Sequence, residues 1–186
     1  PAESGTSDAC SSLPPQPPAS VPAPSSSQPP SAPDTVLVRG AASLDALAST
    51  ATIVIAELLP EVVAWNRGPL AHLAAHPLDD PRVRVRIADV AEVMSEGTHH
   101  AILLDVDNGP DAFTAPSNSK LYGVRGLERA RRALVPGGTL AVWSVADDKA
   151  FTGRLRGVGF SVETHRVPPR PNSGARHVVW IARAPQ

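Results

Sequence analysis

Short apolar runs alternate with amphipathic stretches along the chain from Asp34 onward. Each run is rich in Val, Ile or Leu and is nearly continuous, which is typical of strands that are buried on both faces of a parallel sheet. The predicted strands are Thr35–Val38, Thr52–Ala56, Val83–Ile87, Ala101–Val106 and Thr139–Trp143. The amphipathic stretches between them predict helices over Ser43–Ala48, Pro60–Leu73, Val90–Ser95, Val124–Leu134 and Asp147–Arg156.

Glycine and proline mark where several of these elements end. Pro69 disfavours helix in the residue before it, so the second helix is expected to end or kink at 66–69. Gly137-Gly138 predicts a helix stop that leads directly into the next strand. The last two runs, Gly159–Arg166 and Arg176–Arg183, have only a proline-rich turn between them, which indicates an antiparallel pair. The predicted fold class is therefore α/β, a Rossmann-like open, mostly parallel sheet with helices on both faces and a C-terminal antiparallel hairpin.

The first 33 residues differ from the rest in composition. They hold 10 of the 21 prolines and nine serines, with almost no large apolar side chains. Such a segment cannot bury enough surface to offset the entropy lost on ordering. We predict a disordered Pro/Ser-rich tail over residues 1–33, with a proline-rich ligand as the less favoured interpretation, and an ordered domain over residues 34–186. Because the chain begins with Pro1, we expect a fragment or a processed product.

Charge and cysteine content argue against several classes of protein. The chain has 17 basic and 18 acidic side chains, so neither a nucleic-acid nor a membrane partner is expected. The four arginines between positions 125 and 132 are expected to form a solvated helix face, since nucleic-acid binding would need a wider basic surface. Cys10 is the single cysteine and the histidines lack metal-ligand spacing, so no metal is expected. With no apolar run of transmembrane length and no secretory signal, we expect a cytoplasmic protein.

Acidic side chains follow three of the predicted strands, at the sheet edge where open α/β folds bind ligands. Glu57 follows the second strand, where a carboxylate can accept both hydrogens of a ribose diol. Asp89 follows the third strand and suits either an exocyclic amine or a helix cap. Asp105, Asp107 and Asp111 close the fourth strand, where crowded carboxylates can hold amines or cations, or can stabilise a turn.

These segments resemble the spermidine synthase-like (polyamine aminopropyltransferase) branch of the class I S-adenosylmethionine-dependent methyltransferase fold. The resemblance runs over about residues 52–183 and rests on four segments, Ala56–Arg67, Asp79–Val83, Ala101–Asp111 and Leu127–Leu140. It implies a transferase that moves an aminopropyl or methyl group from decarboxylated S-adenosylmethionine or S-adenosylmethionine to a small amine. Oligomerisation, which full-length members use, is left open.

The resemblance implies roles for single residues. The acid that matches Glu57 binds the nucleoside ribose, and the acid that matches Asp89 contacts the adenine. The acid that matches Asp105 serves the amine nucleophile, as its base or its electrostatic partner. Beside it, Asp107 and Asp111 suit the cationic nitrogens of a polyamine substrate.

Two further positions belong to this hypothesis, and both leave alternatives open. Tyr122 is assigned to the wall of the amine channel, with plain packing as the alternative. Gly40 is assigned to the cofactor loop, but it is the only glycine in a turn that the family makes glycine-rich. The family's amino-terminal β-hairpin domain is also absent from the sequence, which implies a form truncated at its N-terminus. The alternatives are a catalytically silent methyltransferase-fold domain and a methyltransferase for a small molecule other than a polyamine.

Overall fold

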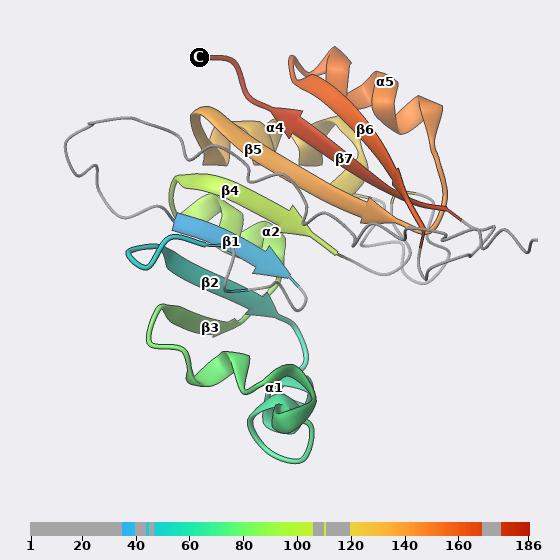
Figure 1. Cartoon of the computed structure of the whole chain (residues 1–186). Coiled ribbons are helices and arrows are strands. Elements are labelled where there is room, and N and C mark those ends of the chain that lie inside the picture. Colours follow the sequence, from blue (N-terminus) through green and yellow to red (C-terminus); the bar gives the residue numbers. More distant parts are fainter. Residues whose placement is uncertain (1–34, 40–43, 45–46, 106–109, 111–119, 169–175) are drawn as a thin grey trace, which may run out of the picture.

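The computed structural model describes residues 35–39, 44, 47–105, 110, 120–168 and 176–186. The tail predicted over residues 1–33 lies outside this set, as do residues 43, 45 and 46 of the helix predicted over Ser43–Ala48. Of the other three, Leu44 lies in a 3₁₀ turn, whereas Leu47 and Ala48 are not helical. The strands among the described residues form one sheet of seven, and the helices pack against it (Figure 1).

The strands follow the order β3-β2-β1-β4-β5-β7-β6 across this sheet. The first five in sequence are parallel to one another, whereas β7 runs antiparallel to both β5 and β6. The predicted open, mostly parallel sheet with a terminal antiparallel pair is therefore confirmed. The strand bounds are β1 (Thr35–Arg39), β2 (Thr52–Glu57), β3 (Val83–Ile87), β4 (His99–Leu104), β5 (Leu134–Ser144), β6 (Ser161–Val167) and β7 (His177–Arg183).

The helices are shorter than the hydrophobic pattern predicts. The second predicted helix ends at Arg67, and Gly68 caps it, so the break expected before Pro69 is confirmed. Val90–Ser95 is divided between one α-helical turn and a 3₁₀ turn. The α-helices are α1 (Pro60–Arg67), α2 (Val90–Val93), α4 (Val124–Ala133) and α5 (Lys149–Gly157), and the 3₁₀ helices are η2 (Ala71–Ala74), η3 (Pro77–Asp79) and η4 (Met94–Glu96).

The start of β5 corrects the prediction at Gly137-Gly138. Helix α4 ends at Ala133 and β5 begins at Leu134, so both glycines lie within the strand rather than at a helix stop. The pairing of β4 with β5 shifts in register here, from His99 opposite Leu134 to Ala101 opposite Thr139. Gly137 has a φ of 73°, which a side chain would disfavour, and this local conformation accommodates the extra residues of β5.

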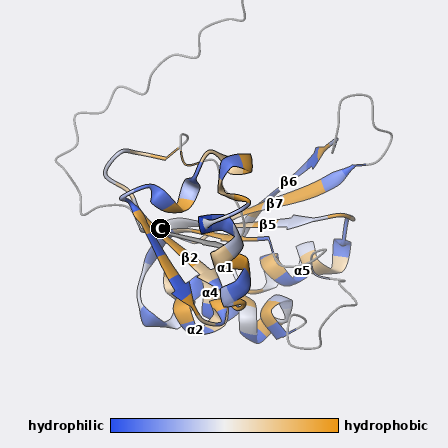
Figure 2. Ribbon diagram, turned by 90° about the horizontal axis from the view of Figure 1, so that it is seen from below, coloured by the Kyte–Doolittle hydropathy of each residue, from blue (hydrophilic) through white to orange (hydrophobic). Residues whose placement is uncertain are grey.

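One face of the sheet is covered by α2, η4, α4 and α5, which hold the main core (Figure 2). Fully buried side chains from the strands meet fully buried side chains from the helices there. Trp180 of β7 packs edge-on against Phe151 of α5, and Phe151 packs edge-on against Tyr122. This core fixes the order of the central strands and therefore the edge at which they end.

The opposite face carries a second, smaller cluster under β2 and β3. Ile53 is fully buried and Val83 nearly so. Partly buried side chains complete the cluster, among them Leu78 of η3 and Leu44 and Leu47 of the connection between β1 and β2. Helical segments thus contact both faces of the sheet, as predicted, but those on this face are short.

Candidate functional site

The strand order places three acidic residues along one edge of the sheet. The chain reverses direction of winding between β1 and β4, and such a switch point leaves a crevice at the carboxyl ends of the strands. Glu57 is the last residue of β2, Asp89 lies two residues beyond β3, and Asp105 directly follows β4. Because β2 and β4 both flank β1, the backbones at Glu57 and Asp105 lie two strand spacings apart, about 10 Å.

Glu57 is held at this edge by its backbone and half-buried by its surroundings. It pairs with Ile87 at the end of β3, and its carbonyl accepts a hydrogen bond from the Ala88 N–H at 3.1 Å. Its side-chain Oε1 accepts from the Leu59 N–H at 3.0 Å. Since a carboxylate has about four acceptor sites, this hydrogen bond leaves acceptor capacity on the second oxygen.

Asp89 acts as the N-cap of α2, the structural role that the sequence left open. Its Oδ1 accepts a hydrogen bond from the Ala91 N–H at 2.8 Å, and its backbone is extended, as an N-cap requires. The side chain is exposed, and its second oxygen keeps its acceptor sites. Capping therefore accounts for one carboxylate oxygen and leaves the proposed contact with adenine as a prediction.

Asp105 is exposed at the end of β4, next to the switch point. Among the other predicted site residues, Gly40, Asp107 and Asp111 lie outside the described residues. Tyr122 is described, and the residue is 2% exposed within the core on the helix-covered face. Its edge-on contact with Phe151 has a centroid distance of 5.7 Å, which fits the packing alternative.

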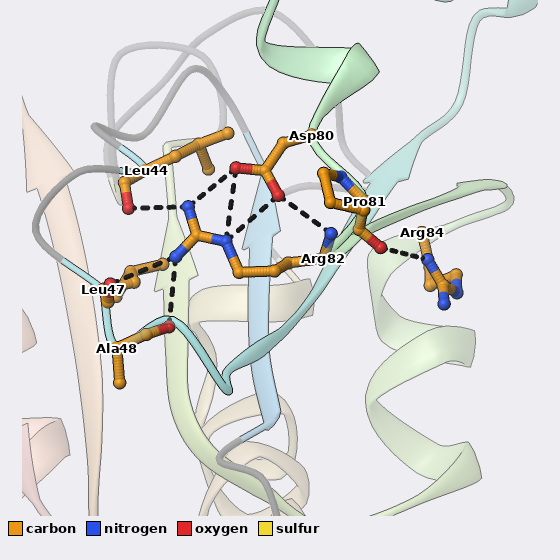
Figure 3. Close-up of polar contacts among 7 residues, drawn as sticks. All are labelled: Leu44, Leu47, Ala48, Asp80, Pro81, Arg82 and Arg84. Carbon is orange, nitrogen blue, oxygen red and sulfur yellow. Dashed lines mark hydrogen bonds and ion pairs between the residues drawn. The ribbon is translucent and has the colours of Figure 1, made fainter.

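A polar network that the sequence did not predict anchors the connection between β1 and β2 (Figure 3). The Arg82 guanidinium donates to the carbonyls of Leu44, Leu47 and Ala48 at 3.0 to 3.1 Å. It also forms an ion pair with Asp80, whose carboxylate it meets through Nε and Nη2. These hydrogen bonds from Arg82 lower the pKa of Asp80 to about 2. The only signal in the sequence is an Asp-Pro-Arg turn, whose carbonyl partners lie more than 30 residues away.

The network matters for the site because the connection it holds begins at the end of β1. In this chain that connection spans residues 40–51, about the minimum length for a crossover between two parallel strands. Arg82 supplies hydrogen-bond donors for three of its carbonyls, so the described part of the segment is tied to the start of β3.

The fold of this chain is that of the class I S-adenosylmethionine-dependent methyltransferases, a fold that spermidine synthases share. The spermidine synthase from Thermotoga maritima superposes with a TM-score of 0.63 at 18% identity, over 82% of this chain and 54% of that one. Human methyltransferase-like protein 13, solved with SAH, gives a TM-score of 0.59 at 18% identity, over 82% of this chain and 72% of that one. The Burkholderia thailandensis 1,6-didemethyltoxoflavin-N1-methyltransferase was solved with 1,6-didemethyltoxoflavin and S-adenosylhomocysteine bound. It gives a TM-score of 0.52 at 22% identity, over 83% of this chain and 72% of that one.

These similarities define the fold. The chain spans about half the length of the spermidine synthases that it resembles. No family model and no curated protein matches the sequence. Among the described residues, no group of three His, Cys, Asp or Glu side chains is arranged to hold a metal ion. No helix in the described part is both long and apolar enough to cross a bilayer.

Proposed function

We propose that this protein is a transferase that binds an adenosyl sulfonium donor at the carboxyl edge of β2, β1 and β4 and transfers its alkyl group to a small amine. The observation that carries the proposal is the alignment of Glu57, Asp89 and Asp105 along the edge where the strand order reverses. The similarity in fold to spermidine synthases and to small-molecule methyltransferases supports it.

Each acid has a separate task in this proposal. Glu57 accepts hydrogen bonds from the two ribose hydroxyls through the carboxylate oxygen that Leu59 does not use. Asp89 accepts from the exocyclic amine of adenine through the oxygen that does not cap α2. In both residues the local backbone hydrogen bond also orients the carboxylate, which lowers the entropy lost when a ligand binds.

The chemistry requires alignment and a proton acceptor. The bound donor supplies a carbon activated by a sulfonium sulfur, so that the C–S bond breaks, with its electron pair left on sulfur, as the amine lone pair forms the C–N bond. Asp105 accepts the proton that the resulting ammonium group releases. Its carboxylate also attracts a cationic acceptor to the edge. The donor, methyl or aminopropyl, and the acceptor, polyamine or another small amine, are the finer parts of the proposal.

Calorimetric titration of the full chain with methylthioadenosine, S-adenosylmethionine and decarboxylated S-adenosylmethionine tests the donor site. Saturable binding is expected, and Glu57→Gln is expected to weaken it roughly tenfold or more, because a hydrogen bond to a charged group is lost. Glu61→Gln is the matched control, since it removes the same charge from an exposed position four residues later. Equal affinity in the two variants would contradict the assigned role of Glu57.

A catalytically silent domain is the second candidate function, and one observation favours it. Glu57 and Asp89 each already accept a hydrogen bond from the local backbone, which gives both acids a structural reason to be present. If the folded protein binds none of the three nucleosides, this second function replaces the first. If it binds, product analysis with amine acceptors and with Asp105→Asn identifies the group transferred and tests the role of the base.

A further inference from the structure

We propose that the outer surface of α4 and α5 binds the phosphodiester backbone of a nucleic acid, independently of nucleotide sequence. The two helices together carry seven cationic side chains and one acidic side chain, Glu128. The whole chain has a net charge of −1, so this surface departs strongly from the average. The isolated arginines of α4 predicted only a solvated helix face, whereas the structure packs α5 beside it and widens the basic surface.

The cations of α4 form a row along its exposed side. Gly126, Leu127, Ala130 and Ala133 face the core, which leaves Arg125, Arg129 and Arg132 together on the outside. Their spacing of four and three residues gives a row about 10 Å long. Among the described residues, these three guanidinium groups form no ion pair.

Helix α5 adds a second row. Phe151 and Leu155 face the core, so that Lys149 and Arg156 lie on the exposed side, again about 10 Å apart along the axis. Arg154 is instead paired with Asp148 at 3.1 Å. Packed helices lie about 8–10 Å apart, so the two rows form a surface about 10 Å square.

The side-chain chemistry favours phosphate over other anionic partners. All four cations of α4 are arginines, whose planar fork binds phosphate through two hydrogen bonds. A protein partner would need an apolar or aromatic centre in the interface, and a membrane would need exposed apolar side chains along the helix. The apolar side chains of α4 are buried apart from Val124 at its start, so this surface fits a polyphosphate backbone best.

Fluorescence anisotropy with the full chain and labelled duplexes tests the proposal at several salt concentrations. If all five exposed cations of the two rows contact phosphates, the slope of log K against log salt is about −4.5 for duplex DNA. Arg129→Glu with Arg132→Glu is expected to weaken binding on the order of tenfold or more and to reduce the slope by about 1.8. Parallel titrations with RNA and DNA identify which nucleic acid supplies the backbone.

The matched control is Arg176→Glu with Arg183→Glu, which makes the same change in net charge at exposed positions of another part of the chain. It is expected to keep wild-type affinity. An equal loss in the two double variants would overturn the proposal, because net charge alone would explain it. No binding at low salt, or tighter binding to polyglutamate or to phosphatidylserine vesicles than to nucleic acid, would overturn it as well. Unchanged binding of the adenosyl donor in both double variants would show that the two sites are separate.

Discussion

The two faces of the sheet are stabilised in different ways. On the face covered by α2, α4 and α5, large apolar side chains such as Trp180, Phe151 and Leu140 are fully buried and contact one another. On the opposite face, the described cluster has Ile53 and Val83 as its buried members, and an arginine network fixes the chain above it. Both faces support the same strands, but one does so by extensive apolar packing and the other by a smaller apolar cluster together with directed hydrogen bonds.

The two faces should differ in the substitutions that they tolerate. Apolar burial is non-directional and scales with area, so the helix-covered face supplies most of the stability. Hydrogen bonds contribute less net free energy but specify geometry, which suits a connection that must hold one end of a candidate site. Substitutions on the helix-covered face should therefore lower the free energy of unfolding more. Substitutions in the arginine network should lower it less but should also change the geometry of the connection between β1 and β2.

The largest effect is expected from Trp180→Ala on the helix-covered face. This change leaves a cavity against Phe151 and removes the hydrogen bond that the indole N–H donates to Thr152, so unfolding should become easier by about 3–5 kcal/mol. Urea denaturation followed by circular dichroism measures it. Trp65→Ala is the control, because Trp65 is 54% exposed and should contribute little. Similar losses in both variants would contradict the comparison of the two faces.

A smaller effect is expected from Arg82→Ala on the opposite face. The carbonyls of Leu44, Leu47 and Ala48 lose their donors, which should reduce stability by about 1–3 kcal/mol. Arg82→Lys should recover only part of this stability, because a single ammonium group cannot reproduce the planar set of N–H donors of the guanidinium. The same denaturation experiment measures it, with Arg84→Ala as control, since among the described residues Arg84 donates to the nearby carbonyls of Pro81 and Val83 alone. A loss as large as that of Trp180→Ala would mean that both faces are equally stabilising.

A pH-dependent effect is expected from His99, a buried polar residue at the start of β4. Burial lowers the pKa of His99, because it disfavours the charged imidazolium. The unfolded state then takes up the proton more readily, so the folded state should lose stability as the pH falls below about 6.5 and should keep it above that value.

Thermal unfolding between neutral and mildly acidic pH measures this dependence. His99→Leu should flatten it, because no titratable group is left at the buried position. His72→Leu, at an exposed histidine, should leave the slope unchanged. If the melting temperature of His99→Leu falls with pH as steeply as that of the wild type, other groups cause the dependence.

The smallest effect is expected from Glu96→Gln at the exposed edge of the sheet. Glu96 pairs with Arg86 through two short hydrogen bonds, of 2.6 and 2.9 Å, and the pair lowers the pKa of Glu96. Both side chains are about half exposed, so water and salt screen the interaction. The melting temperature should be nearly unchanged in physiological salt. A marked drop would show that exposed ion pairs also stabilise this domain.

Local features of the sequence were enough to predict much of the fold. The apolar runs predicted the seven strands, because central strands buried on both faces are apolar nearly throughout. The edge strands β3 and β6 instead alternate apolar with exposed polar side chains. The positions of Glu57, Asp89 and Asp105 at the ends of three strands were also predicted locally, since a strand end and the next residue are adjacent in the chain. The exact ends were not, because β2 includes Glu57 and β4 ends at Leu104 rather than at Val106. The break after Arg67 was also local, because glycine and proline act on their own backbone.

Other features depended on contacts between distant segments. The start of β5 at Leu134 requires the partner strand β4, whose register shift draws both glycines into the sheet. Arg82 finds its carbonyl partners more than 30 residues earlier, and no periodicity in the sequence indicates them. The packing of α5 beside α4 joins two basic rows that are unremarkable alone. Local sequence pattern is thus enough to locate the strands and the acids at their ends. Which of these segments meet depends on the folded chain, because hydrogen bonds and packing act through space rather than along the sequence.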